Sequence, residues 1–345
     1  MNRTINLLNL FVCGMVLAGC AVTPPPAGSE SDRPRPRPAL KNIPPPPKPP
    51  PVPPRQEVAL DEKLRETARQ QIVTSSQSSD IVLRCQAMEA AQIAGGPDAI
   101  TVILRGLKDR EPYVRFAAAL AAGSLKLESA RARLLELADD PDANVRVGVR
   151  YALHKLGDRR LSHDLEKLAM DPNPTVRRNT VMVLGLLGEP SAVKVLWPLK
   201  RDLDPAVRIQ VAEALWRLGN ETGLEDCVAA CVSQYPDEQI IGVLALAAPR
   251  DARVRGHLRG KLTTPYEEVN LAAARALGML GDDLGYGVAL KGARSSDPRQ
   301  RALAALAFGA IGRMDAQSIL ELLLRDSDES VRLAAAVGVL QLKSS

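Results

Sequence analysis

From residue 57 onward, hydrophobic and polar residues follow a pattern that repeats every 31 residues. The dipeptide Val-Arg begins at Val145, Val176 and Val207, and steps of 31 residues in both directions keep nine copies in register without an insertion. Positions one, five, eight, nine and twelve of each copy form one apolar helix face, since successive side chains are about 100° apart. One copy cannot bury that face alone, so the copies must stack. The nine copies begin at Leu83, Val114, Val145, Val176, Val207, Glu238, Val269, Gln300 and Val331.

Capping residues mark where each helix begins and ends. Asp-Pro stands before the dipeptide at Asp140, Asp171 and Asp297, and is shifted to Asp204 in another copy. Asp as N-cap and Pro in the first turn begin a helix, and Gly just past the last apolar residue ends it. We therefore expect a long helix of about twelve to fourteen residues in each copy, then a shorter one, such as residues 191–200. Six copies carry the terminal glycine twelve residues after their first position: Gly95, Gly157, Gly188, Gly219, Gly281 and Gly312.

These signals predict an all-α fold. We expect a right-handed α-solenoid of about nine 31-residue helical-hairpin repeats, with residues 57–77 as the opening helix. The eighth position of the long helix is alanine except at Val183 and Gly338. Small residues there would let neighbouring helices approach closely while larger neighbours fill the core.

Together, Asp-Pro, Val-Arg, the alanine-rich helix and the terminal glycine resemble HEAT-like (HEAT/armadillo-like) repeats, specifically the short class also seen in phycobilin lyases. The resemblance covers residues 80–345. The copy at Glu238 departs most, because it lacks both Val-Arg and the glycine, so the curvature there is left open. In such families the repeated arginine pairs with acidic groups of adjacent turns, which implies a structural ladder. Acidic residues close enough in sequence to serve are Asp109, Asp142, Asp204 and Asp328.

The N-terminus has the features of an export signal. Arg3 precedes an apolar run from Ile5 to Leu17, which is short for a transmembrane helix, and small residues follow it. Leu-Ala-Gly-Cys, ending at Cys20, resembles the lipobox of bacterial lipoproteins, which implies cleavage before Cys20 and acylation of that cysteine. Several acyl chains would anchor the protein stably in a membrane. Ala21 resembles the class sorted to the outer membrane, facing the periplasm, in a Gram-negative source.

Between this cysteine and the repeats lies a proline-rich segment. Fifteen of the 27 prolines fall between residues 21 and 56, and such runs favour extended polyproline II. We expect a tether whose basic residues either contact anionic lipid or cell-wall polymers or merely keep a soluble linker extended. The expected divisions are a signal peptide (1–19), the lipidated cysteine with its tether (20–56) and the solenoid (57–345).

Charge argues against a solenoid that binds nucleic acid. The formal net charge is +5, but residues 1–20 contribute +1 and residues 21–56 contribute +4. The repeats are therefore electrically balanced, and the basic excess belongs to the N-terminal segments.

Catalytic and metal-binding motifs are scarce. The three histidines lie in different copies, and the sequence has no phosphate loop, nucleophile elbow or dinucleotide fingerprint. Cys227 and Cys231 lie one turn apart, yet they align with leucine and alanine positions of other copies, which favours core packing over metal binding or redox sensing. We expect a protein that is not an enzyme and needs no cofactor or metal.

Positions three, seven and ten of the long helix lie opposite the core face, yet many of them are apolar. One interpretation is a groove that takes a partner segment or an acyl chain; the other is packing against adjacent units. The exposure of the side chains distinguishes the two. The candidate groove residues are Phe116, Leu120, Val147, Tyr151, Met182, Ile209, Trp216, Ile240, Leu244, Leu271, Leu306 and Leu333.

The two ends of the repeat array differ. Residues 57–71 are rich in charge and suit a polar cap, whereas the last helix, from Val331 to Leu342, is followed by only three residues, which predicts a surface for a partner or for self-association. We expect a membrane-anchored envelope lipoprotein whose solenoid is a protein-protein interaction scaffold. The alternatives are a carrier of lipid or another hydrophobic ligand, or an enzyme like the bilin lyases, against which the lipobox counts.

Overall fold

The computed structural model describes residues 48–56, 58–59, 61–160 and 162–343. Within these ranges the regular structure is entirely helical, which confirms the predicted repeat architecture, and none of the helices has the length and hydropathy needed to cross a membrane. The long helices are α3 (Ile81–Ala94), α5 (Pro112–Ser124), α7 (Ala143–Lys155), α9 (Pro174–Leu187), α11 (Pro205–Arg217), α13 (Pro236–Ala247), α15 (Glu267–Met279), α17 (Pro298–Ile311) and α19 (Glu329–Gln341). The shorter elements are α2 (Glu62–Ser75), α4 (Gly96–Gly106), η2 (Glu128–Ala130), α6 (Arg131–Glu136), η3 (Leu137–Asp139), α8 (Asp164–Leu168), η4 (Pro190–Ala192), α10 (Val193–Leu199), α12 (Glu221–Ala230), η5 (Ala252–Val254), α14 (Arg255–Arg259), α16 (Tyr286–Gly292), η6 (Met314–Ala316) and α18 (Gln317–Leu323).

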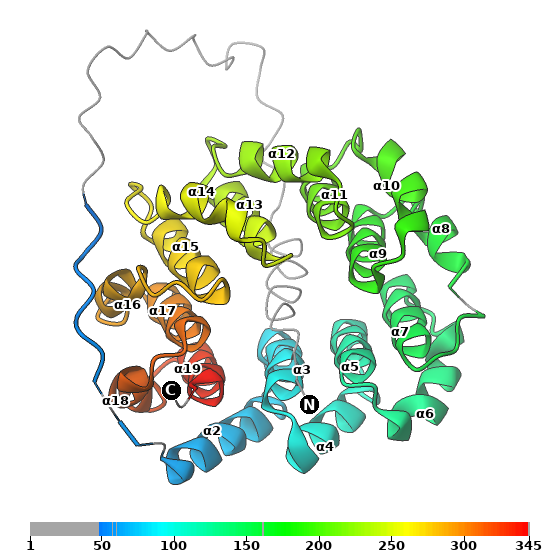
Figure 1. The fold of residues 1–345 in the computed structure, drawn as a ribbon. Coiled ribbons are helices and arrows are strands. Elements are labelled where there is room, and N and C mark those ends of the chain that lie inside the picture. The colour runs from blue at the N-terminus through cyan, green and yellow to red at the C-terminus, as the bar shows by residue number, and fades with distance from the viewer. Residues whose placement is uncertain (1–47, 57, 60, 161, 344–345) are drawn as a thin grey trace, which may run out of the picture.

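The stack of helical pairs closes into a ring (Figure 1). The long helices form the inner layer and the short helices the outer layer, and α2 and α3 pack against α19, so that the two ends of the array meet. At this seam the backbone N–H of Asp61 donates to Gln317 Oε1 at 3.1 Å, and the Arg65 guanidinium donates to the Leu340 carbonyl at 3.3 Å. The curvature of the array therefore completes a full circle, which an open solenoid does not do.

The seam corrects the expected state of the C-terminal end. Helix α2 is amphipathic, with Leu64, Ala68 and Ile72 buried and charged residues on its outer face. This buried face and α3 cover α19, whose Leu333 is 2 % exposed. The prediction of an uncapped final helix free for self-association is wrong, because α2, the first helix in the described part of the chain, covers it.

The predicted helix ends are confirmed in detail. All six terminal glycines have a positive backbone φ, from 62° at Gly95 to 91° at Gly157. The same conformation occurs at the equivalent position of the two copies that lack the glycine at an internal helix end, at Lys126 (52°) and Arg250 (61°). A left-handed conformation costs a residue with a side chain about 1–2 kcal/mol. The register of the repeat therefore imposes this turn even where the residue disfavours it.

Side-chain caps begin most of the long helices. Asp204 and Asp297 cap α11 and α17, as predicted. In α7 and α9 the N-cap lies two residues after the predicted one, at Asp142 and Asn173. Asp140 instead accepts the backbone N–H of Asp142 at 3.0 Å through Oδ1, and its two oxygens also accept from a side chain of α5.

The small residues of the eighth position do allow close packing. A Cβ on Gly123 would lie 2.6 Å from the Cα of Ala152, which is the eighth residue of the next copy. The same arrangement recurs at Gly309, where a Cβ would lie 2.7 Å from the Cα of Gly338. Successive inner helices therefore touch backbone to backbone at these points.

Candidate interaction surface

Most of the side chains predicted to line a partner groove are buried. Nine of the twelve are at most 7 % exposed, and Ile209, Ile240 and Leu306 are half-buried. The buried nine are Phe116, Leu120, Val147, Tyr151, Met182, Trp216, Leu244, Leu271 and Leu333.

Contacts between neighbouring repeats involve this column directly. Phe116 on α5 packs against Gly148 on α7, where an added Cβ would lie 2.8 Å from Phe116 Cδ2. The hydroxyl oxygens of Tyr151 on α7 and Ser124 on α5 lie 3.0 Å apart in a hydrogen bond. At these positions the burial favours inter-repeat packing over an open groove, because each inner helix is covered by its neighbours.

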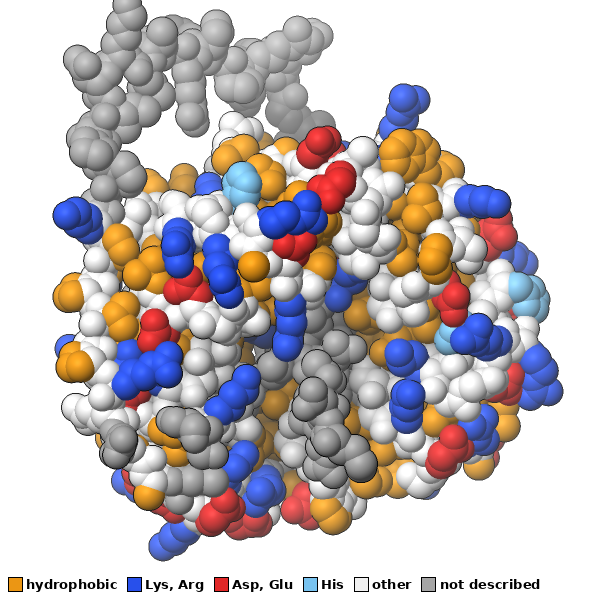
Figure 2. All heavy atoms as spheres, in the orientation of Figure 1, with side chains coloured by type: hydrophobic (Ala, Val, Ile, Leu, Met, Phe, Trp, Pro, Cys, Tyr) orange, Lys and Arg blue, Asp and Glu red, His pale blue; other side chains and the backbone are white. Residues whose placement is uncertain are grey.

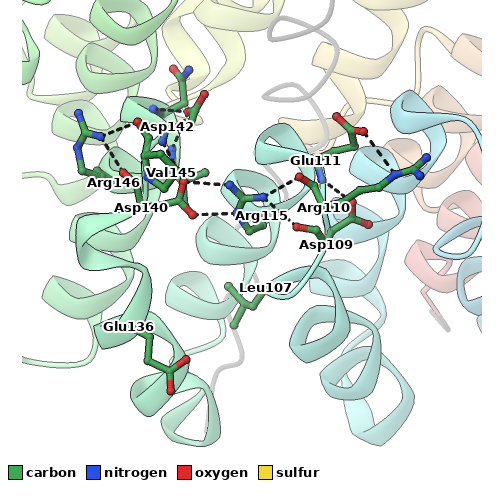
Figure 3. Close-up of polar contacts among 12 residues, drawn as sticks. Leu107, Asp109, Arg110, Glu111, Arg115, Glu136, Asp140, Asp142, Val145 and Arg146 are labelled. Carbon is green, nitrogen blue, oxygen red and sulfur yellow. Dashed lines mark hydrogen bonds and ion pairs between the residues drawn. The ribbon is translucent and has the colours of Figure 1, made fainter.

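An ion-pair ladder runs along the loops that lead into the long helices (Figure 3). Arg115 donates through Nε and Nη2 to the two carboxylate oxygens of Asp140, each at 2.9 Å. Its Nη1 donates to the carbonyls of Asp109 and Arg110, also at 2.9 Å, so one guanidinium joins two successive loops. Such two-pronged pairs are strong and directional. The same bridge joins Arg84 to Asp109, Arg177 to Asp202 and Arg301 to Asp326.

The ladder implied by the family resemblance is therefore present, but most of its carboxylates differ from those expected. Of the four candidates only Asp109 is an acceptor of a ladder arginine. Asp142, Asp204 and Asp328 cap α7, α11 and α19, and each carboxylate accepts backbone N–H groups of its own helix. The ladder carboxylates lie two residues earlier, where the side chain is not needed as a cap.

Two of the ladder arginines lower the pKa of the carboxylates they bind. Hydrogen bonds from Arg177 lower the pKa of Asp202 against the opposing effect of burial, and those from Arg301 do the same for Asp326. The Arg177 and Asp202 side chains are only 16 % and 5 % exposed. Water therefore screens these pairs weakly, and the loss of one partner would leave a costly buried charge.

The ladder has two interruptions within the described residues. Between α7 and α9, Arg146 donates to two carbonyls of its own loop but forms no bridge to Asp171, and between α11 and α17 the acidic partner itself is missing. Arg208 still donates to the Asp202 carbonyl at 2.8 Å, but the residue 25 positions later is not acidic. Arg299 on α17 donates to Asp237 on α13 at 3.1 Å, so side chains two repeats apart meet past the intervening α15. Three consecutive copies have a hydroxyl residue in place of the ladder aspartate: Ser233, Thr264 and Ser295.

Exposed hydrophobic side chains gather on the loops before α11, α13 and α15. Leu203 is 95 % exposed, Val232 71 %, Tyr235 57 % and Tyr266 39 %, and we call these four residues the rim patch. They lie on consecutive loops of neighbouring repeats, so the patch crosses repeat boundaries. Exposed apolar clusters of this kind are typical of protein interaction sites.

The sequence contains a signal for the rim patch that the column analysis missed. Tyr235 and Tyr266 are the N-cap residues of α13 and α15, and neither makes a side-chain cap. The helices α7, α9, α11, α17 and α19 have Asp or Asn at that position. A large aromatic residue at a position where a cap is usual is therefore the sequence signal for this patch.

Charged groups of both signs are interspersed over the rest of the face drawn in Figure 2, and hydrophobic side chains are exposed over α10. Trp197 on α10 is half exposed, and Lys200 Nζ lies 5.1 Å from the centroid of its ring. This mixed surface agrees with the electrical balance of the repeats and gives no broad field of one sign.

The cysteine and histidine side chains described next take part in packing and in local polar contacts. Cys227 and Cys231 are buried free thiols, and burial raises the pKa of Cys231 to about 12, so both pack as small hydrophobic residues, as predicted. His154 Nδ1 lies 2.8 Å from Ser162 Oγ, and His163 lies exposed beside Asp164. In the ranges that the structure describes, no three His, Cys, Asp or Glu side chains are grouped to hold a metal ion.

A match to a known repeat family agrees with this architecture. The family described as HEAT repeats matches residues 66–154 and 161–235. The chain is similar to the complex of CpcE and CpcF of phycocyanin lyase from a Nostoc species, at 18% identity and a TM-score of 0.43, over 69% of this chain and 93% of that one. It is also similar to human deoxyhypusine hydroxylase, at 18% identity and a TM-score of 0.36, over 81% of this chain and 96% of that one. No curated protein matches the sequence. Residues 66–154 and 161–235 are thus HEAT repeats, and helical pairs of the same period continue to the seam of the ring.

Proposed function

We propose that this protein is a lipid-anchored envelope scaffold whose ring of HEAT repeats binds a protein partner through the rim patch. The observation that carries the proposal is where large apolar side chains are exposed. They begin with Leu203, beside Asp202, the last ladder carboxylate before the second interruption, and continue on the next two loops, where Ser233 and Thr264 replace the ladder aspartate. HEAT repeats generally mediate protein-protein contacts, and the role proposed is binding without a catalytic step.

The chemistry of the rim patch suits a protein surface. Tyr235 and Tyr266 each combine a large apolar ring with a hydroxyl, and aromatic residues of this kind are enriched among binding hot spots. Leu203 is almost completely exposed, which is unfavourable in water unless a partner covers it. The neighbouring ladder holds the loop of Leu203 in place through the pair of Arg177 with Asp202, so little order has to be gained on binding.

Anchoring rests on the lipobox at Cys20, which lies outside the described residues. Acylation there, with Ala21 as the next residue, would place the ring at the outer membrane on the periplasmic side. Growth with an alkyne fatty acid tests this directly: the native chain should incorporate label and fractionate with membranes, and Cys20→Ala should do neither. Label on the Cys20→Ala chain would contradict the lipidation site.

A carrier of lipid or another hydrophobic ligand is not proposed. That function needs the apolar column of the inner helices as an open cavity, and nine of its twelve side chains are buried. The half-buried Ile209, Ile240 and Leu306 do not by themselves enclose an acyl chain.

Crosslinking in the intact envelope tests the scaffold role. A photo-crosslinking residue placed at Val232 should capture one protein partner, and the double change Leu203→Ser with Tyr235→Ser should abolish that crosslink. Leu322→Ser is the matched control, because Leu322 is 70 % exposed on α18, away from the rim patch, and its change should leave the crosslink intact. Equal capture by the native and the doubly changed chain would exclude the rim patch as the binding site.

A further inference from the structure

The end of the proline-rich segment, expected to be a free tether, is docked on the ring. Residues 50–56, which we call the strap, run along the outer helices of the last repeats toward α2. The carbonyl oxygens of Pro50 and Pro51 face Gly287 on α16, where an added Cβ would lie 2.7 and 2.8 Å from them. Val52 is half-buried against the hydrophobic core. A residue with a side chain at position 287 would thus push the strap away.

One arginine, Arg313, binds the backbone of the strap through hydrogen bonds. Arg313 Nη1 donates to the Pro53 carbonyl at 3.0 Å, and Nη2 donates to the Pro54 carbonyl at 3.1 Å. The Arg313 side chain is 2 % exposed, and its guanidinium carbon lies 4.1 Å from the centroid of the Tyr286 ring. The stacked ring and the covering strap keep water from these hydrogen bonds, which strengthens them.

Acidic groups orient this arginine and extend the site. Asp315 accepts from Arg313 Nε at 3.0 Å and from Nη2 at 2.6 Å, and it also accepts the backbone N–H of Gln56 at 3.3 Å. Arg55 pairs with Asp283 at 3.1 Å. The site therefore binds the carbonyls of Pro53 and Pro54, the side chain of Arg55 and the N–H of Gln56.

These features match the chemistry of a polyproline segment. Proline has no N–H, so the carbonyls of a proline run lack backbone partners of their own and are exposed along the extended chain. Aromatic side chains and fixed donors are what known recognition modes use to bind such segments. The arrangement is specific to backbone shape, and Asp283 adds selectivity for a basic residue that follows the prolines.

We propose that Tyr286, Gly287, Arg313, Asp315 and Asp283 form a recognition site for an extended proline-rich segment followed by arginine. In the resting protein the strap fills this site in cis. Because the strap leads directly into α2, which covers α19, its docking holds the seam of the ring closed. A strap on the same chain is present at high effective concentration, so a proline-rich segment in trans binds only when the strap is released.

Peptide binding tests the site. The probe is a fluorescent peptide of residues 47–58, and the protein is the full chain with residues 50–54 replaced by a Gly-Ser sequence. This variant should bind the peptide at least about tenfold more tightly than the native chain, whose site is occupied. Equal binding by the two chains would overturn the proposal.

Two changes locate the contact. In the strap-replaced chain, Arg313→Gln should weaken peptide binding about tenfold or more, since two charge-assisted hydrogen bonds are lost. Arg325→Gln is the matched control, because Arg325 lies on the same repeat and is exposed. An Arg55→Ala peptide should also bind more weakly, and this change leaves the protein untouched, so misfolding cannot explain the loss. Peptide binding insensitive to both changes would refute the site.

Hydrogen exchange tests the effect on the ring. Replacing the strap should speed amide exchange in α2 and α19 while α7, on the far side of the seam, stays as in the native chain. Unchanged protection of α2 would show that the strap does not hold the seam.

Discussion

Two regions of the ring differ in how their equivalent loops are joined. At four junctions, such as α5 to α7, an arginine bridges successive loops through a carboxylate 25 residues later. Between α11 and α17 the carboxylate is replaced by serine or threonine, and the loops before α13 and α15 expose Val232, Tyr235 and Tyr266, while Leu203 is exposed on the loop of Asp202, where the ladder breaks off.

The difference separates what folds a repeat from what joins repeats. The second residue of the copies keeps its hydrogen bond to the carbonyl six residues earlier in both regions, at Arg177 and at Gln239 alike. The interrupted region therefore loses only the bridge between loops. A surface that needs to bind a partner can give up that bridge, because helix packing still holds the repeats together.

The largest expected effect comes from cutting one bridge. Arg177→Ala removes the partner of the buried Asp202 and should lower the free energy of unfolding by about 2–4 kcal/mol. Arg208→Ala is the matched change in the interrupted region; it removes a carbonyl contact of the same kind but no bridge, and should cost about 1 kcal/mol or less. Urea unfolding of the two variants measures this, and equal losses would mean that the bridge adds nothing.

The second largest effect expected from the ladder is a dependence of stability on acid pH. Because Arg177 lowers the pKa of Asp202 in the folded state, the pair stabilises the fold above the ordinary aspartate pKa near 4, and that stability is lost as pH falls through the lowered value. The free energy of unfolding should thus decline below about pH 4, and Asp202→Asn should make the decline shallower. An Asn variant with the native pH profile would contradict the linkage.

A smaller gain is expected at the two strained helix ends, one in each region. Lys126→Gly and Arg250→Gly relieve a left-handed conformation and should each raise the free energy of unfolding by about 0.5 kcal/mol, after the entropic cost of glycine. Gly188→Ala is the reverse test, since Gly188 has the same conformation and open space around it, and it should be destabilising. A loss of stability at Lys126→Gly would show that its side chain contributes more than its backbone strain.

The smallest effect on stability should come from the rim patch itself. Leu203→Ser and Tyr235→Ser remove exposed side chains and should change the free energy of unfolding by less than about 0.5 kcal/mol. Thermal unfolding checks this, and a large loss would place these residues in the structure of the ring rather than in binding.

Local features of the fold were predictable because neighbouring residues determine them. The helical pairs and the glycine turns follow from residues within one copy, and the 31-residue period and the core role of Cys227 and Cys231 follow from comparing the copies. Even the helix ends at Lys126 and Arg250 follow from the register. The candidate site was harder to predict from the sequence. Periodicity identified which side chains lie opposite the core, but not that Phe116 or Tyr151 packs against the next helix.

By itself the sequence therefore determined the repeat unit, its caps and the balanced charge of the solenoid. Only the tertiary structure decided that the units close into a ring, that α2 covers α19, that Arg115 pairs with Asp140 instead of Asp142, and that Arg313 captures the strap. The physical reason is that these contacts depend on small rotations between successive units. Those rotations accumulate over the whole array, and no single copy encodes their sum.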